Sequence, residues 1–389
     1  MKKLLSLILV LLLLTACGKN LEDVSSIVNA ESESIVANES TTQSQSATLS
    51  NSFLETSSQT ESEGVKVFKN NNCVSLGAYH LSMVFCDFYG DDFESRKKEF
   101  TEVVNSGYFN TYFLPLDTYL MTELEIIAKA GGSAFISAGI IDTNQIESYV
   151  NRIKIYIDTA NKMGYGDIIE GFYWDEPVSL FDMKNEALYE YTKALYKAFG
   201  KRIYPIMASG DFLLEDAHSY TFEEADAINK QHPKALSYVT DIGFDYYWRD
   251  ARSEDGKAYF SHTRQILLNY IGHDANFWHW PCAYTTELSN SVDGITKANE
   301  EYCLEHLNFL ASDILSLEYP GGIVLYTYYG KAHDNRYNTM QHFLEFKDKN
   351  GNYTIMPTAQ KWKKYSQRLL ELNNLFSSKK AKKPTFNFN

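Results

Sequence analysis

The sequence lacks the signatures of several common protein classes. No GxGxxG follows an apolar run, which argues against a dinucleotide-binding fold. The nine histidines never occur as HxH or HExxH, so neither a metal nor another cofactor is expected. Lysine and arginine number 36 against 50 acidic residues, and the formal charge is -14. The chain therefore lacks the positive surface of a nucleic-acid-binding protein.

A membrane-spanning run is also missing at the N-terminus. The apolar stretch at 4–14 has eleven residues, whereas a transmembrane helix needs roughly 20. With the basic start Met1-Lys2-Lys3 before it and small residues after it, it has the parts of a secretory signal. The ending Leu-Thr-Ala-Cys resembles a bacterial lipoprotein signal. That resemblance implies export, removal of residues 1–16, and a lipid on Cys17 that anchors the chain to the outer face of the membrane.

Composition divides the remainder of the chain. Within 18–64, 17 of 47 residues are Ser or Thr, and eight acidic residues face one basic residue. Such a stretch buries too little apolar surface to offset its chain entropy, so 17–64 is predicted to be a disordered tether. A folded domain is expected over 65–376, followed by a flexible tail at 377–389 whose four lysines form a solvated basic run.

Cysteine usage leaves the redox state open. After Cys17 the chain has Cys73, Cys86, Cys282 and Cys303, and no CxxC pair. An exported protein could bridge Cys73 with Cys86 or Cys282 with Cys303, and free buried thiols are an equal alternative.

The folded part repeats a rhythm of short apolar runs and longer stretches with helical spacing. That alternation is typical of parallel strands joined by crossover helices. The eight predicted strands are 74–80, 111–116, 133–140, 168–174, 203–208, 239–247, 276–284 and 322–329. Helical spacing is clearest at 94–106, 145–163, 184–199, 222–234 and 299–317, and a closing helix is predicted at 358–376.

Eight strand and helix units predict an α/β fold, specifically a (β/α)₈ TIM barrel. A doubly wound open sheet is the alternative, but it would have fewer strands or a glycine-rich first turn. The Gly321-Gly322 pair begins the eighth strand instead of following it, so the backbone phosphate cradle common in barrels is not expected.

In such a barrel the active site lies at the C-terminal ends of the strands. Carboxylates and aromatic rings dominate those ends here. The residues expected to bind substrate are His80, Asp117, Trp174, Tyr246, Trp248, Trp278, His279, Trp280, Tyr326 and Tyr328. Rings that stack on the CH face of a pyranose, with polar groups for its hydroxyls, favour a carbohydrate ligand.

The sharpest motif is Trp-Asp-Glu-Pro at 174–177. Of two adjacent acids, one can stay protonated through its neighbour's charge and partial burial, as a general acid at neutral pH must. The alternative is that Asp175 caps the next helix and Glu176 is solvated.

This motif, with Asp245-Tyr246 and the Gly-Gly-Ile-Val-Leu-Tyr run at 321–326, resembles the glycoside hydrolase barrels, closest in style to the chitinase and hexosaminidase families. The resemblance implies that Glu176 protonates the leaving oxygen while Asp175 orients the 2-acetamido group of the substrate, with Tyr246 or Tyr328 holding its carbonyl. The acids before Asp175 do not have chitinase spacing, so the Asp-Glu pair of the hexosaminidase type is the better match.

Other mechanisms and functions remain open from sequence. A retaining reaction would need a second carboxylate about 5 Å from Glu176. The seventh strand contains no Glu, so Asp245 is the candidate, and an inverting arrangement is a further alternative. The primary hypothesis is a monomeric, surface-anchored glycoside hydrolase acting on an N-acetylhexosamine-containing glycan. The rival hypothesis is a non-catalytic glycan-binding lipoprotein on the same scaffold.

Overall fold

The computed structural model describes most of the predicted folded domain. The described residues are 74–87, 89–139, 143–178, 183, 185–208, 223–224, 227, 230, 235–245, 253–283, 286–287, 297–298, 300–326, 361–368 and 371. The predicted leader, Cys17, the tether, Cys73 and the basic tail lie outside these residues. Within them, no helix has both the length and the apolar character that crossing a membrane requires.

Eight parallel strands form one sheet that curls toward closure, as a (β/α)₈ barrel requires. Their spatial order is β1-β10-β7-β6-β5-β4-β3-β2. The strands are β1 (Ser75–Ala78), β2 (Thr111–Leu114), β3 (Ser133–Ser137), β4 (Ile169–Asp175), β5 (Arg202–Met207), β6 (Asp241–Asp245), β7 (Asn276–Trp280) and β10 (Pro320–Leu325). Because the first strand pairs with the last, the alternative of an open doubly wound sheet is excluded.

The seam between β1 and β2 closes through one side chain. The backbone N–H of Asn110 donates to the carbonyl of Leu76 at 2.9 Å, and the Leu76 N–H donates to Oδ1 of Asn110 at 2.7 Å. The strands approach closely here, since a Cβ on Gly77 would lie 2.9 Å from the Thr111 carbonyl oxygen. The Asn110 amide thus replaces a missing ladder bond and completes the barrel.

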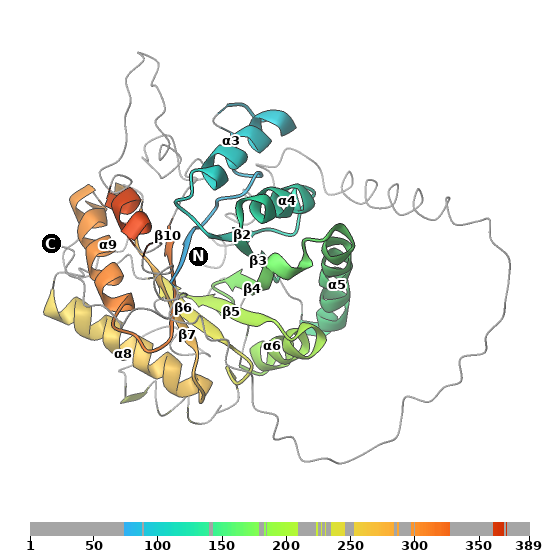
Figure 1. Cartoon of the computed structure of the whole chain (residues 1–389). Helices are drawn as coiled ribbons and strands as arrows, with labels where there is room; N and C mark the ends of the chain where they lie inside the picture. The colour runs from blue at the N-terminus through green and yellow to red at the C-terminus, as the bar shows by residue number, and fades with distance from the viewer. Residues whose placement is uncertain are drawn as a thin grey trace, which may run out of the picture. The chain divides into compact units, whose positions relative to one another are not determined.

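Helices surround the strands on the outside (Figure 1). They are α3 (Phe93–Asn105), α4 (Leu120–Ala130), α5 (Ile146–Met163), α6 (Asn185–Phe199), α8 (Glu254–Ile271) and α9 (Glu300–Ile314), with short 3₁₀ turns η1 (Thr143–Gln145) and η2 (Gly166–Ile168). Residues 361–368 of the predicted closing helix are helical and bury Trp362 and Tyr365. Two short strands, β8 (Thr286–Glu287) and β9 (Lys297–Ala298), pair antiparallel.

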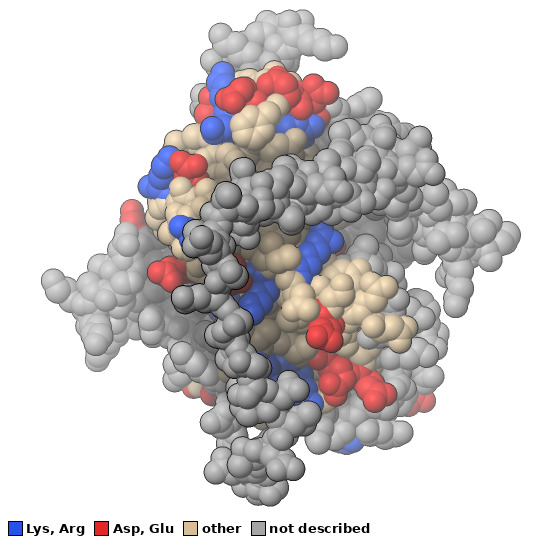
Figure 2. Space-filling view, turned by 90° about the vertical axis from the view of Figure 1, so that its right-hand side faces the viewer, with Lys and Arg blue, Asp and Glu red and all other residues tan. Residues whose placement is uncertain are grey.

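On the face seen in Figure 2, acidic and basic side chains of the described residues are interspersed among neutral ones. No extended area of one charge sign gathers over the part of that face that the structure describes. The described part of this face thus shows no continuous positive patch of the kind that binds a polyanion.

The two-residue period of the strands separates two apolar layers. Alternate residues such as Leu76, Phe172 and Ile323 face the helices and form the larger core. The residues between them fill the barrel with aromatic rings, namely Tyr79, Phe113, Phe135, Tyr173, Tyr204, Trp278 and Trp280. The interior is therefore a packed core, as in other barrels of eight strands.

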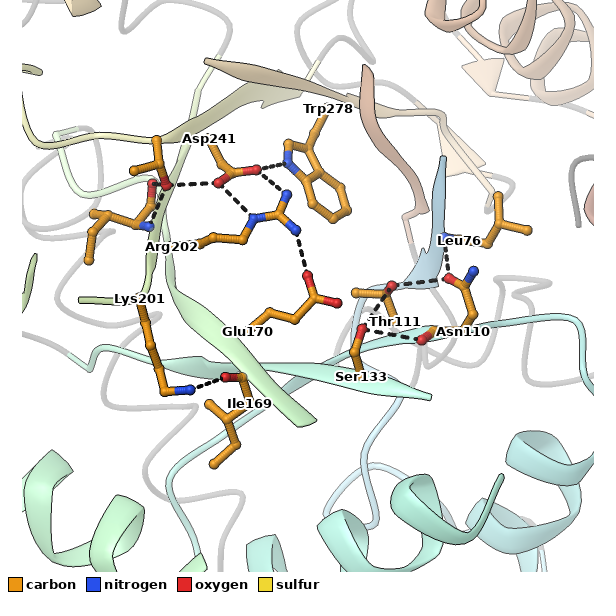
Figure 3. Close-up of polar contacts among 12 residues, drawn as sticks. Leu76, Asn110, Thr111, Ser133, Ile169, Glu170, Lys201, Arg202, Asp241 and Trp278 are labelled. Atoms are coloured by element: carbon orange, nitrogen blue, oxygen red, sulfur yellow. Dashed lines mark hydrogen bonds and ion pairs between the residues drawn. The ribbon is translucent and has the colours of Figure 1, made fainter. Parts of the chain in front are cut away.

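An ionic network occupies the end of the interior where the strands begin (Figure 3). Arg202 pairs with Asp241 through two nitrogens and with Glu170 at 2.5 Å, while the Trp278 indole donates to Asp241 at 2.8 Å. Arg202 and Asp241 are both buried. A Cβ on Gly322 would lie 2.4 Å from the Trp278 ring, so this glycine makes room for the indole. The glycine pair thus has a packing role.

The strand boundaries differ from the sequence prediction for physical reasons. The first strand was expected to extend to His80, but β1 ends at Ala78 because His80 adopts φ 55, which a strand cannot accommodate. The fourth was expected to end at Trp174, yet β4 continues to Asp175 because that residue pairs with Ile206. The predicted helix at 222–234 is described only at four positions.

Candidate active site

The acid pair lies at the C-terminal end of β4. Asp175 is the last residue of the strand, and Glu176 donates its N–H to the Ile206 carbonyl at 2.8 Å before the chain turns at Pro177. Both acidic residues are half-buried. They therefore combine partial desolvation with access to the outside, as a catalytic carboxyl requires.

Backbone strain gathers at this end of the barrel. Among the described residues, the non-glycine positions with positive φ are His80 at 55 and Glu176 at 39. Non-glycine residues in this region cost of order 1 kcal/mol or more, and such strain is concentrated at functional sites. The strain thus marks both β1 and β4 at the ends where the sequence motifs predicted a site.

Tyr79 connects these two strand ends. Its hydroxyl donates to Oδ2 of Asp175 at 3.1 Å. Its ring stacks on Tyr326, with centroids 5.6 Å apart and 20° between planes, and meets the Trp280 ring edge-on at 5.4 Å. His80 packs against Tyr79 at 4.3 Å between ring centroids. A fixed hydroxyl thus lies against one member of the acid pair.

Tyr326 follows β10, and its hydroxyl is affected by several acids at this end of the barrel. Burial raises the pKa of its hydroxyl, and the negative charges of Asp175, Glu176 and Asp245 raise it further. Asp175, Glu176 and Asp245 thus lie on or directly after strands at the same end of the barrel as Tyr326, and their charges act on its hydroxyl. That hydroxyl stays protonated and can donate a hydrogen bond.

A second pair of carboxyl groups lies beyond the end of β2. Burial raises the pKa of Asp117 to about 6, although backbone N–H groups that include Tyr119 at 2.8 Å oppose the shift. Burial, followed by the charge of Asp117, raises the pKa of Glu123 to about 8. The Ser82 hydroxyl donates to Glu123 at 2.8 Å, so this buried acid fastens the segment after β1 to α4.

Of the remaining residues predicted from sequence to bind substrate, some point into the barrel and others point toward the outer helices. Trp280 lies in the interior and donates its indole N–H to the Tyr204 hydroxyl at 2.5 Å. Trp278 is fully buried at the opposite end of the interior, beside Asp241.

Two of the predicted substrate-binding residues face the outer helices. Trp174 is buried against Tyr191 of α6, with ring centroids 5.6 Å apart. His279 is buried and its Nε2 lies 3.0 Å from Asp313 of α9. Burial lowers the pKa of His279 and outweighs the opposing effect of Asp313. Trp174 and His279 therefore pack against the helices, whereas Trp278 packs inside the barrel.

Three of the predicted site residues fall outside the part of the chain that the structure describes. Tyr246, Trp248 and Tyr328 lie outside the described residues. In the described ranges, no three side chains of His, Cys, Asp or Glu are grouped so that they could hold a metal ion.

The cysteines that the structure describes are thiols. Cys86, Cys282 and Cys303 are buried and unbridged. The sulfur atoms of Cys282 and Cys303 lie 3.9 Å apart, next to each other in the interior cluster. The bridge considered from sequence is therefore not formed, although its two partners are neighbours.

Sequence reasoning missed Tyr79 and Glu123. A signal for Tyr79 was present, because Ser75, Gly77 and Tyr79 share the inward face of the first strand by alternation. Glu123 gave no comparable signal, since an acid in an amphipathic helix usually faces water.

Comparison with known proteins agrees with the fold. No protein-family model and no curated protein matches the chain. Among solved structures, it is similar to a GH2 beta-galacturonidase from Eisenbergiella tayi bound to galacturonate, with a TM-score of 0.50, 13% identity, and coverage of 76% of this chain and 51% of that one. It thus spans about half of that enzyme.

Two other solved structures are similar at lower scores. One is a GH113 beta-1,4-mannanase, with a TM-score of 0.45, 14% identity, and coverage of 78% of this chain and 99% of that one. The other is a GH128 endo-beta-1,3-glucanase from Amycolatopsis mediterranei in complex with laminarihexaose, with a TM-score of 0.41, 14% identity, and coverage of 66% and 89%.

Proposed function

We propose that this chain is a glycoside hydrolase whose reaction takes place at the C-terminal end of β4. The observation that carries the proposal is the half-buried pair Asp175 and Glu176 at the end of β4, where the Tyr79 hydroxyl donates to Asp175. With Asp245 at the end of β6, carboxyl groups and tyrosine hydroxyls at this end of the barrel supply an acid, a base or nucleophile, and a hydroxyl donor, which glycosidic cleavage requires.

Each residue has a proposed role. Glu176, strained and accessible, donates a proton to the leaving oxygen. Asp175 assists, either by orienting a 2-acetamido group of the substrate or by stabilising positive charge that develops at the anomeric carbon. Asp245 on β6 is the candidate second carboxylate. The anomeric configuration of the first product, read by NMR, separates retention from inversion.

A more specific proposal concerns the substrate and location. We propose an N-acetylhexosamine-containing glycan, because the adjacent Asp-Glu pair resembles that of hexosaminidases. Thiazoline analogues of N-acetylhexosamines should then inhibit. We also propose that the lipid on Cys17 anchors the enzyme to the outer face of a membrane, which palmitate labelling of wild type and Cys17→Ala would test.

The decisive experiment is hydrolysis of a panel of aryl glycosides and polysaccharides. Wild type should cleave at least one substrate, and Glu176→Gln should lose about 10²-fold or more in rate. The matched control is Glu186→Gln, which alters an exposed acid of α6 and should keep full rate. Equal inactivity of wild type and Glu176→Gln, with glycan binding retained, would instead favour a non-catalytic binding protein.

A further inference from the structure

We propose that Tyr79 is a positioning residue that holds Asp175 in its ionised form and in a fixed orientation, so that the proton of the acid pair resides on Glu176. The inference rests on the proposed function but concerns a residue directly after β1 that no sequence motif marked. Its basis is the hydrogen bond from the Tyr79 hydroxyl to Asp175 Oδ2 at 3.1 Å.

The backbone fixes where the Tyr79 side chain enters the barrel. Its N–H donates to the Leu325 carbonyl at 2.9 Å and so continues the register of β1 with β10 by one residue. Alternation along β1 then directs the side chain into the interior, and His80 turns the chain away directly afterwards. Tyr79 is consequently the residue directly after β1, and its side chain enters the interior.

Three rings restrict the orientation of Tyr79. Tyr326 covers one face in a stacked arrangement, while Trp280 and Tyr173 meet it edge-on at centroid distances of 5.4 and 6.3 Å. Stacked and edge-on pairs are each favoured geometries for aromatic rings. Because the ring cannot turn away, its hydroxyl remains directed at Asp175.

Packing alone does not account for a tyrosine here. A phenylalanine would fill the same space without the cost of burying a hydroxyl, so the hydroxyl must have a polar partner. Burial raises the pKa of Tyr79 well above its ordinary value, and the charge of Asp175 raises it further. The phenol therefore keeps its proton at neutral pH and acts as a hydrogen-bond donor.

Such a donor favours the charged form of its carboxylate acceptor. Asp175 ionises first, and its negative charge then disfavours ionisation of the adjacent Glu176. The division of roles between two neighbouring acids thus follows from a hydrogen bond supplied by a distant strand. This is the arrangement that a general acid beside a charged partner needs.

The test compares Tyr79→Phe with Tyr173→Phe. Both remove one phenol hydroxyl from the same interior cluster and keep the ring. Within the described residues, only the first of these hydroxyls donates to Asp175. Near-ultraviolet circular dichroism and the melting temperature establish that both variants are folded.

Activity gives the first readout. In Tyr79→Phe the acidic limb of the kcat/KM profile should move up by about one to two pH units, since a hydrogen bond to a charged group is lost. At the optimum, kcat should fall about tenfold with little change in KM, because orientation is lost without loss of a substrate contact. Tyr173→Phe should leave the acidic limb in place.

A second readout does not require activity. In the full chain labelled with ¹³C at aspartate side-chain carboxyls, the Asp175 signal is assigned by its disappearance in Asp175→Asn. Its titration midpoint should rise in Tyr79→Phe and stay unchanged in Tyr173→Phe. An unchanged midpoint in Tyr79→Phe, or an equal rise in both variants, would overturn the inference. A wild type that cleaves no glycoside would refute the proposed function while the titration still decides the role of Tyr79.

Discussion

Replacement of Glu123 by glutamine should change how the stability of the protein depends on pH. Glu123 is completely buried in α4 and accepts hydrogen bonds from Ser82 and from the Met83 N–H. Its pKa is raised from 4.5 to about 8, by burial and then by the charge of Asp117. A glutamine preserves the acceptor oxygen and has no proton to lose.

Proton linkage determines whether stability rises or falls with pH. The unfolded chain releases the Glu123 proton near pH 4.5, whereas the folded chain retains it to about pH 8. The contribution of this group to stability is therefore complete below pH 4.5 and declines as the pH rises to about 8. At about 1.36 kcal/mol per unit of pKa shift, the loss over that window is about 3 to 5 kcal/mol.

Urea unfolding of wild type and Glu123→Gln, measured at intervals from pH 4.5 to 8.5, would test this reasoning. The free energy of unfolding of wild type should fall relative to the variant by the amount just given. Glu125→Gln, at a partly exposed position of the same helix, is the control and should follow the wild-type pH dependence. Parallel curves for wild type and Glu123→Gln would show that Glu123 is not held protonated.

Three further predictions concern packing and redox state. Arg202→Met should lower the free energy of unfolding in urea by about 3 to 5 kcal/mol, because it leaves the buried Asp241 charge uncompensated. An unchanged urea midpoint would show that the ion pair of Arg202 and Asp241 does not stabilise the fold. Cys282 and Cys303 should react with iodoacetamide only after denaturation, and peptides joined by a disulfide in non-reducing mass spectrometry would contradict their thiol state. Trp174→Phe should lower the melting temperature and leave kcat unchanged, whereas a large loss of kcat would show that this ring contacts substrate.

The apolar periodicity of the sequence was sufficient to predict the barrel fold. The short strands are separated by helices with clear apolar spacing, and eight such units permit few architectures. Periodicity did not predict where strands end, because individual interactions determine those positions. The positive φ of His80 ends β1, and pairing with Ile206 extends β4 to Asp175, and neither effect is encoded in an apolar pattern.

The candidate site was predicted in part because position along a barrel strand carries functional information. Asp175 and Asp245 end β4 and β6, and Tyr326 directly follows β10, so the three residues lie at the same end of the barrel. Trp174 and His279 were selected for their residue type, but alternation directs their side chains to the helices. Stricter use of the two-residue period would have assigned both side chains to the outer layer and Tyr79 to the interior.

The network of Arg202 and Asp241 could not be read from the sequence. The two residues are 39 positions apart and become partners only through the pairing of β5 with β6. A charged residue at the start of a strand is more often exposed than buried, so its role depends on tertiary structure.

The central claim is that the acid pair at the end of β4 acts on a bound sugar. The most direct test is a crystal structure of Glu176→Gln with the glycan that wild type cleaves. We expect the scissile glycosidic oxygen within about 3 Å of the residue 176 side chain, next to Tyr326. A glycan bound elsewhere on the protein, with the end of β4 unoccupied, would contradict the account.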